Sequence, residues 1–204
     1  MNDEQKKTRT KGKMIVVYGI NGIGKTTQVE LLVKYLQEQG HAASRLKYPV
    51  YDLEPEGPFI YKYLRDPKFR AAHPKTTAEL QLLYVENRRR YEPELRERLD
   101  EGEWIIAEDY IGTGIAWGLT WGSDLDYLEK INEGLLQPDM SILMTGERFT
   151  SALEKDHRNE MDDERMRICK NFHTLLGQRY GWKVIHANDT LEVVQMQLRT
   201  IVNN

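Results

Sequence analysis

Residues 14–36 read MIVVYGINGIGKTTQVELLVKYL, and the expected fold follows from this stretch. Its first five residues form a short apolar run rich in β-branched side chains, which is typical of a strand buried on both faces of a parallel sheet. Further along, Val29, Leu32 and Leu36 recur at helical spacing, and Gly40 supplies a C-terminal stop. The stretch therefore predicts a strand and a helix joined by a glycine-rich turn.

The turn has the spacing of a phosphate-binding P-loop, in which Gly19 is followed after four residues by Gly24, Lys25 and Thr26. Backbone amides of such a loop surround an anion, and the helix adds its positive dipole end. We expect Lys25 to reach the β and γ phosphates of a nucleotide and the Thr26 hydroxyl to hold Mg²⁺. The alternative is a glycine turn with a structural role only. The predicted triphosphate-binding residues are Gly19, Asn21, Gly22, Ile23, Gly24, Lys25, Thr26 and Thr27.

Composition narrows the class of protein. The 204 residues are 40% hydrophobic and 30% charged, which is ordinary for one globular domain. A net charge of −3 gives no basic footprint, so we expect no nucleic-acid polymer as partner. Cys169 is the single cysteine and cannot form an internal disulfide, and the polar start lacks the apolar core of a signal peptide. No apolar run is long enough for a membrane span, so we expect a cytoplasmic protein without a membrane partner. We expect residues 1–12 to be a disordered leader and residues 13–204 to be one domain.

Strand and helix patterns alternate along the rest of the chain. This βαβα order predicts an α/β three-layer sandwich of the P-loop NTPase type, with a parallel sheet and helices on both faces. After residues 14–18, the expected strands are residues 42–48, 104–108, 140–145 and 183–187. After the first helix, the expected helices begin at residues 76, 123, 166 and 191.

Residues 48–67, YPVYDLEPEGPFIYKYLRDP, carry four prolines and five aromatic residues. Proline restricts the backbone and aromatic rings offer flat surfaces, so this segment is expected to be a loop. The pattern fits the wall of a small-molecule pocket and a packed surface loop about equally well.

The helix that begins after residue 76 carries an arginine on its buried face. A capping box at Thr76 and Glu79 predicts its start. Arg88 continues the apolar stripe, whereas Arg89 and Arg90 are expected to face solvent. A buried guanidinium without a partner is costly, so an internal carboxylate or a bound anion must pair Arg88. We favour the anion.

Glu108 and Asp109 follow the strand at residues 104–108. In an open α/β sheet, ligands bind at the carboxyl ends of the strands, where the P-loop also lies. An acid there can orient the waters around Mg²⁺ or contact an acceptor. The alternative roles are a helix N-cap and a salt bridge.

Residues 147–164 are almost entirely polar, which suits a mobile lid over bound nucleotide. The alternative is a solvated helical hairpin. The cations of this segment, Arg148, Lys155 and Arg158, are candidates for the catalytic charge. The five histidines have no metal-ligand spacing, so no zinc site is predicted, and Cys169 is expected in the core.

Together these motifs resemble the thymidylate kinase family, from the P-loop to the last helix. GINGIGKTT, residues 19–27, is similar to the family's P-loop, and LLYVENR, residues 82–88, has its aromatic residue four positions before an arginine. EDYIGTGIAWG, residues 108–118, is similar to the family's Asp-Arg-Tyr stretch. LLQPDMSIL, residues 135–143, is similar to its leucine-proline-aspartate entry to the fourth strand.

The resemblance implies transfer of a phosphoryl group from ATP to dTMP with Mg²⁺, in dTTP synthesis, by a homodimer. It would place Tyr84 against the thymine ring and Arg88 on the acceptor nucleotide. The expected acceptor-binding residues are Tyr48, Tyr84, Arg88, Asp109 and Tyr110. The expected catalytic residues are Lys25, Glu108, Arg148, Lys155 and Arg158, with Thr26 and Glu108 at the metal.

Three positions depart from the family pattern. Asn21 stands where the family has an acid, and Tyr51 and Asp109 stand where it has arginines. A dianionic acceptor beside an unpaired Asp109 would be repelled. Either Arg88, Lys47 or a lid arginine compensates, or the acceptor is a deoxynucleoside or another nucleoside monophosphate. A nucleotide-dependent switch without kinase activity is a further alternative.

Overall fold

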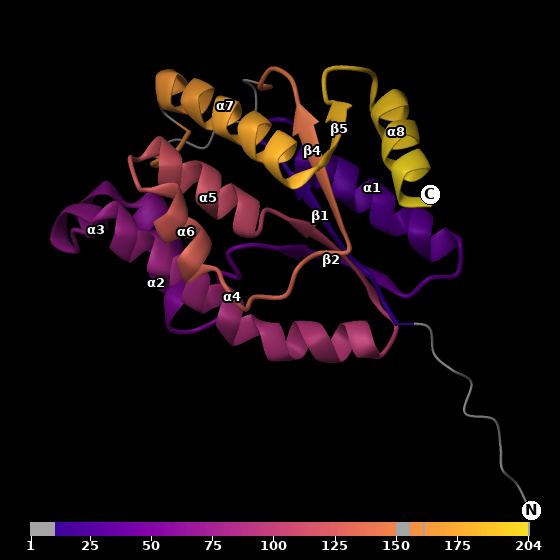
Figure 1. Ribbon diagram of the computed structural model, residues 1–204, viewed down its shortest axis with the longest axis horizontal. Coiled ribbons are helices and arrows are strands. Elements are labelled where there is room, and N and C mark those ends of the chain that lie inside the picture. The colour runs from indigo at the N-terminus through magenta and orange to yellow at the C-terminus, as the bar shows by residue number, and fades with distance from the viewer. Residues whose placement is uncertain (1–10, 150–155, 161, 204) are drawn as a thin grey trace, which may run out of the picture.

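The computed structural model describes residues 11–149, 156–160 and 162–203. These residues form one five-stranded sheet in the order β2-β3-β1-β4-β5, and every neighbouring pair of strands is parallel (Figure 1). The predicted parallel sheet is therefore confirmed. The strands are β1 (Met14–Tyr18), β2 (Ala43–Lys47), β3 (Trp104–Glu108), β4 (Met140–Thr145) and β5 (Lys183–His186).

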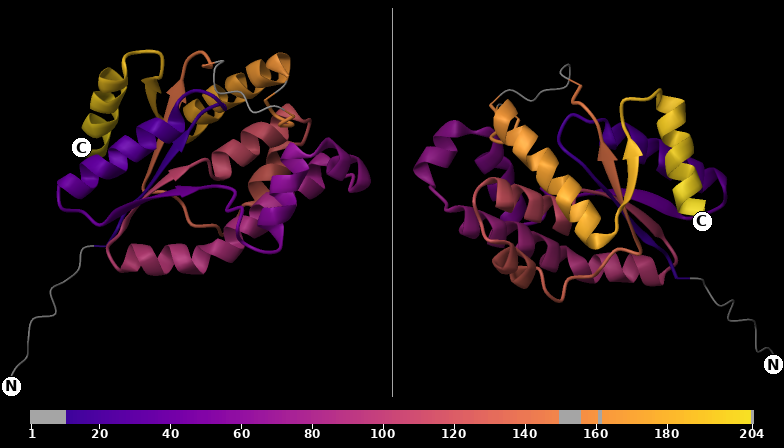
Figure 2. Two further views of the ribbon diagram at one scale, coloured as in Figure 1. Left: turned by 180° about the vertical axis from the view of Figure 1, so that it is seen from behind. Right: turned by 45° about the horizontal axis from the view of Figure 1, so that its top comes forward.

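Helices cover both faces of this sheet, as predicted. α1 and α8 contact each other on one side, and α4 runs along the opposite side (Figure 1, Figure 2). The helices are α1 (Lys25–Glu38), α2 (Glu56–Arg65), α3 (Pro67–Ala72), α4 (Thr77–Asp100), α5 (Ile111–Thr120), α6 (Leu125–Ile131), α7 (Asp163–Tyr180) and α8 (Leu191–Asn203).

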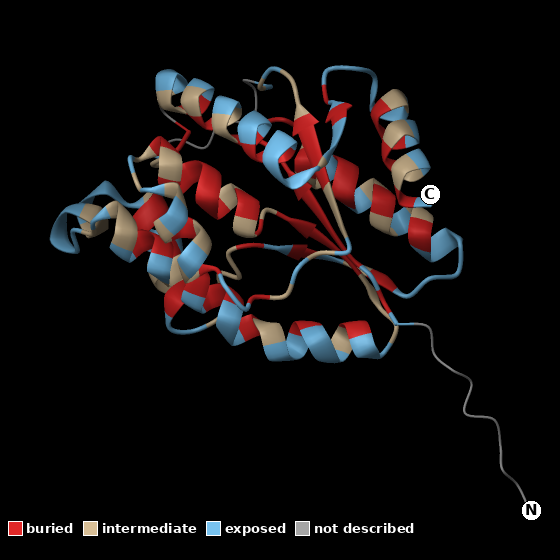
Figure 3. Cartoon of the chain, in the orientation of Figure 1, coloured by how far each residue is buried: buried red, intermediate tan, exposed pale blue. Residues whose placement is uncertain are grey.

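β1 lies between two apolar cores because its alternate side chains point to opposite faces. Ile15 and Val17 pack with the residues of α1, whereas Met14 and Val16 pack with those of α4. All five residues of the strand are buried (Figure 3). The P-loop therefore extends from the most protected strand of the sheet.

The capping box of α4 is present, with the Thr76 side chain accepting from the amide of Glu79 and Glu79 accepting from the amide of Thr76. Cys169 is buried in the core, as expected. The predicted helix after residue 123 is shorter than expected and forms α6.

The expected loop at residues 48–67 is wrong in its second half, which forms α2 and starts α3. Pro55 and Pro58 stand at the N-cap and in the first turn of α2, where proline removes no intrahelical hydrogen bond. Glu56 accepts two hydrogen bonds of 2.8 Å from Arg90 of α4. Arg90 therefore ties two helices together, and is not merely a solvated charge.

α5 has no counterpart among the predicted elements. Its glycines lower helix propensity, and they are needed here for close packing. A Cβ atom on Gly112 would lie 2.4 Å from the ring of Trp182, and one on Gly118 would lie 2.6 Å from Leu128.

The expected leader falls mainly on residues 1–10, outside the described residues. Gly12 is buried, and its amide donates to the Leu99 carbonyl at 2.8 Å. No helix in the described part of the chain is long and apolar enough to cross a membrane.

Candidate nucleotide-binding site

The P-loop joins β1 to α1 through glycines in the left-handed region. The φ angles of Gly19, Gly22 and Gly24 are 144°, 76° and 86°, which side chains with a Cβ atom rarely adopt. Gly24 is the N-cap of α1 and offers no side-chain cap. The first amides of α1 are thus available to an anion.

Lys25 is held against its own loop. Its Nζ donates to the carbonyls of Gly19 at 2.8 Å and Ile20 at 3.0 Å. The same atom lies 3.6 Å from Asp109 Oδ1, which also accepts a hydrogen bond of 3.0 Å from Thr113. Asp109 is therefore not the unpaired acid that the sequence suggested, because it is paired with the P-loop lysine.

Glu108, which is 1% exposed, lies beside the start of α1. Its Oε2 accepts a hydrogen bond of 2.7 Å from Thr26 and lies 3.8 Å from Lys47 Nζ, and its Oε1 accepts from Arg45. One hydroxyl and one carboxylate side by side suit Mg²⁺, which usually takes one or two protein oxygens and completes its shell with water and phosphate.

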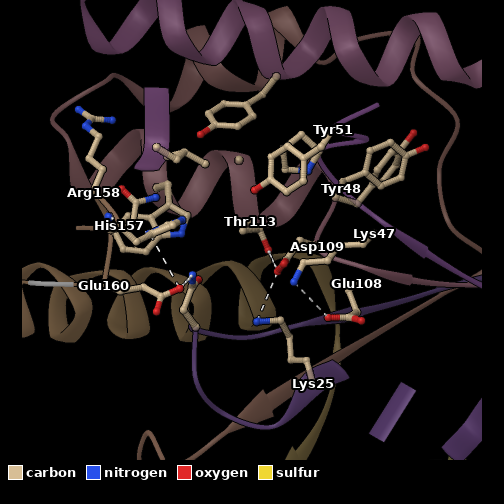
Figure 4. A pocket seen from close by; sticks show the side chains of 18 of the residues that line it. Lys25, Lys47, Tyr48, Tyr51, Glu108, Asp109, Thr113, His157, Arg158 and Glu160 are labelled. Atoms are coloured by element: carbon tan, nitrogen blue, oxygen red, sulfur yellow. Dashed lines mark hydrogen bonds and ion pairs between the residues drawn. The ribbon is translucent and has the colours of Figure 1, made fainter. Parts of the chain in front are cut away.

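One cavity of about 430 Å³ joins the P-loop to the expected acceptor residues (Figure 4). Gly19, Ile23 and Arg148 do not line it, and Lys155 lies outside the described residues. The predicted residues that line it are Asn21, Gly22, Gly24, Lys25, Thr26, Thr27, Tyr48, Tyr84, Arg88, Glu108, Asp109, Tyr110 and Arg158.

Arg88 is buried at 4% exposure, and its side chain lines this cavity. Its Nη1 donates to Asn132 Oδ1 at 2.8 Å, and its Nε has no partner in the described part of the chain. Burial lowers the pKa of the Arg88 guanidinium. The protein partner of Arg88 is therefore an amide and not the internal carboxylate that was one of the two alternatives, and the bound anion stays a prediction. One donor stays available to a ligand.

Two positions shape the space around Arg88. Tyr84 lies one turn before it on α4, and burial raises the pKa of the Tyr84 hydroxyl. Gly114 of α5 faces the guanidinium, because a Cβ atom there would lie 2.3 Å from Arg88 Nη2. A glycine at this position leaves room for the arginine.

The described part of the expected lid contacts the P-loop. The amide of Phe149 donates to the Gly22 carbonyl at 2.7 Å, and Asn21 donates to Glu160 at 2.8 Å. Arg148 Nη1 lies 3.2 Å from both the Glu160 carbonyl and Asp163.

Arg158 reaches the cavity from this segment. Its guanidinium lies 3.8 Å from the ring centre of Trp121, as does that of Arg165. Burial lowers the pKa of Arg158. Its amide donates to the Leu64 carbonyl at 2.8 Å, which ties the segment to the end of α2.

Sequence reasoning missed several residues that line or support the cavity: Arg45, Arg65, Gln81, Thr113, Trp117 and Trp121. Gln81 carried a usable signal, because it lies one turn before Tyr84 on the same face of α4. Arg65 carried no such signal, because its segment was not recognised as helical. Trp121 carried none either, because it lies at the end of α5.

A parallel sheet of this order, with a P-loop at its central strand and a cavity lined by cations and aromatic rings, defines a P-loop nucleotide-binding protein of the α/β class. The sequence profile described as thymidylate kinase matches residues 17–198. The chain therefore belongs to the thymidylate kinase family, and the predicted family is confirmed.

Known relatives agree with this assignment. Thymidylate kinase of Arabidopsis thaliana is 28% identical over 198 residues, covering 95% of this chain and 72% of that protein. Thymidylate kinase of Homo sapiens is 27% identical, covering 94% and 90%. The solved thymidylate kinase of Candida albicans superimposes with a TM-score of 0.79 at 22% identity, covering 95% and 92% of the two chains.

Proposed function

We propose that this protein transfers the γ-phosphoryl group of ATP to the phosphate of dTMP, forming dTDP for dTTP synthesis. The observation that carries this proposal is the single cavity that contains both the P-loop and the Tyr84–Arg88 face of α4. Two nucleotides bound at these sites share one enclosed space, which direct transfer between them requires.

On the donor side, the P-loop amides and Lys25 bind the triphosphate. Lys25 gives up hydrogen bonds to two loop carbonyls and turns toward the phosphates. Thr26, together with Glu108 through water, would hold Mg²⁺, which neutralises phosphate charge when bound. Arg45 at the other carboxylate oxygen keeps Glu108 oriented toward Thr26.

On the acceptor side, Tyr84 packs against the base and the available Nε of Arg88 donates to the nucleotide. The buried hydroxyls of Tyr48 and Tyr110, which have no partner among the described residues, are further donors facing this compartment. A phosphate oxygen is already anionic, so the transfer needs no strong general base. The protein's task is mainly to position two nucleotides and neutralise charge.

We further propose that residues 147–164 act as a lid that brings a catalytic cation to the transferred group. Arg158 is the best-supported candidate because it lines the cavity, whereas Arg148 does not. The expectation for Lys155 concerns a residue outside the described ranges. A cytoplasmic homodimer is also proposed; Leu175, Val184 and Met196, each more than half exposed, are apolar side chains that a second copy could cover.

The test follows ADP release from ATP and Mg²⁺ with a panel of acceptors: dTMP, dUMP, dCMP, dGMP, UMP, thymidine and none. Fast turnover with dTMP, abolished by Lys25→Ala, supports the proposal. Turnover with thymidine instead of dTMP makes the protein a deoxynucleoside kinase. Turnover with another monophosphate changes the acceptor, and nucleotide binding without transfer leaves a switch. Sedimentation velocity measures the oligomeric state.

A further inference from the structure

Gln81 is a buried amide on the cavity side of α4. Its side chain is 3% exposed and lines the same cavity as the P-loop and Tyr84. It makes no hydrogen bond with any of the described residues. Gln81 therefore leaves both its donor and its acceptor to a molecule in the cavity. Four buried amides that do not line this cavity each have a protein partner: Gln28, Asn87, Asn132 and Gln195.

A second donor without a partner comes from the end of α5. The indole Nε1 of Trp121 is buried, belongs to a side chain that lines the cavity, and has no hydrogen-bond partner in the described ranges. The Trp121 carbonyl accepts from Thr77 Oγ1 at 3.3 Å, and Thr77 lies one turn before Gln81 on α4. The guanidinium groups of Arg158 and Arg165 each lie 3.8 Å from the ring centre of Trp121, which restricts the ring.

The base of an acceptor nucleotide packed on Tyr84 lies within reach of Gln81. Residues three apart on a helix are neighbours on its surface, so Gln81 and Tyr84 border the same part of the cavity. A base stacked on an aromatic ring keeps its edge free for hydrogen bonds. The edge of a pyrimidine carries donors and acceptors side by side, and so does a glutamine amide. The two groups are therefore complementary.

The cost of a mismatch makes such a contact selective. In the open cavity water can pair the amide, and a base that displaces this water must replace its hydrogen bonds. A base that cannot do so leaves a buried polar group unsatisfied, which costs more than a typical hydrogen bond contributes. The amide of Gln81 can therefore discriminate between bases by their edges, which an apolar wall such as Leu80 cannot do.

We infer that Gln81 hydrogen-bonds to the edge of the acceptor base and determines which bases the site accepts, with Trp121 as a second donor. This inference rests on the proposed function and deepens it, because it names a residue that selects the acceptor. Gln81 binds the base and takes no part in the phosphoryl transfer itself.

The test compares dUMP with dCMP, because these nucleotides differ only in the hydrogen-bonding edge of the base; dTMP is the reference. Calorimetry measures the three dissociation constants for wild type, Gln81→Leu, Gln81→Glu and the control Leu82→Gln. Leu82 is the next residue on α4, is 42% exposed and does not line the cavity. We expect Gln81→Leu to weaken dUMP binding about tenfold or more. Leu82→Gln should match wild type.

Gln81→Glu separates recognition of the base from a structural effect. It replaces the amide donor by an oxygen of similar size, and a carboxylate accepts from the amino group of cytosine but repels the corresponding carbonyl of uracil. The affinity for dCMP relative to that for dUMP should rise about tenfold or more over wild type. The affinity for ATP should stay unchanged. A general loss of folded protein would not alter this ratio, because both ligands are measured on one preparation.

Two results overturn the inference. One is a dCMP-to-dUMP affinity ratio in Gln81→Glu equal to that of wild type, and the other is wild-type affinity for dUMP in Gln81→Leu. If wild type binds dTMP and either result is found, the inference alone fails. If wild type binds none of the three monophosphates, the proposed function fails together with it.

Discussion

His173 of α7 makes the stability of this protein depend on pH. The side chain is 1% exposed. Its Nδ1 contacts the Cys169 carbonyl at 2.9 Å, so Nδ1 carries the proton, since a carbonyl only accepts. Its Nε2 lies 3.5 Å from Thr113, the residue that donates to Asp109. Burial, reinforced by the charge of Lys25, lowers the pKa of His173 from 6.5 to about 4.

The direction of the effect follows from proton binding. Between pH 6.5 and pH 4 the unfolded chain binds a proton at this residue and the folded chain does not. The contribution of neutral His173 to the free energy of unfolding is therefore complete above pH 6.5, and it is lost as the pH falls from 6.5 to 4. Linkage gives a loss of about 2.5 kcal/mol in the free energy of unfolding between pH 7.5 and 4.5.

Urea unfolding at pH 7.5, 6.5, 5.5 and 4.5 measures this contribution. His173→Gln is expected to be less stable at neutral pH but to lose about 2.5 kcal/mol less than wild type on acidification. Leu176→Ala, a buried apolar change on the same helix, should lower stability at every pH and keep the wild-type dependence. Parallel curves for wild type and His173→Gln would refute the reasoning.

Three further variants test other parts of the structure. Arg158→Ala should lower kcat by about 10²-fold or more, because the transition state loses a stabilising charge. The control Arg89→Ala, on the exposed face of α4, should keep near wild-type turnover. Steady-state kinetics measures kcat for both variants. Gly114→Ala should displace Arg88 and raise the KM for the acceptor about tenfold with little change in the KM for ATP, because the new methyl group would lie 2.3 Å from Nη2. Leu95→Ala should cost about 2–5 kcal/mol in urea unfolding, since this side chain is fully buried under the sheet.

The predictable part of the fold rests on local patterns. The strands β1, β3 and β4 are short apolar runs, and the predicted boundaries of all five strands agree within one residue. α5 was not predicted because its glycines lower helix propensity, and the reason for them, close packing against Trp182 and Leu128, involves residues elsewhere in the sequence. α2 escaped because prolines in a first helical turn look the same as prolines in a loop.

The same distinction between local patterns and contacts across the sequence applies to the site. The P-loop could be predicted because one continuous stretch contains its whole geometry. The environment of Arg88 could not be predicted, because Asn132 lies 44 residues away and no local pattern indicates that the two side chains meet. The pairing of Asp109 with Lys25 depends likewise on two neighbouring strands, β1 and β3, ending side by side.

That pairing also restricts how the sequence can change. An arginine introduced at position 109 alone would set a guanidinium against the ammonium group of Lys25 and deprive Thr113 of its acceptor. The charges at this end of the sheet are therefore interdependent, and a single substitution does not convert one arrangement into another. A lineage could cross between them only through paired changes.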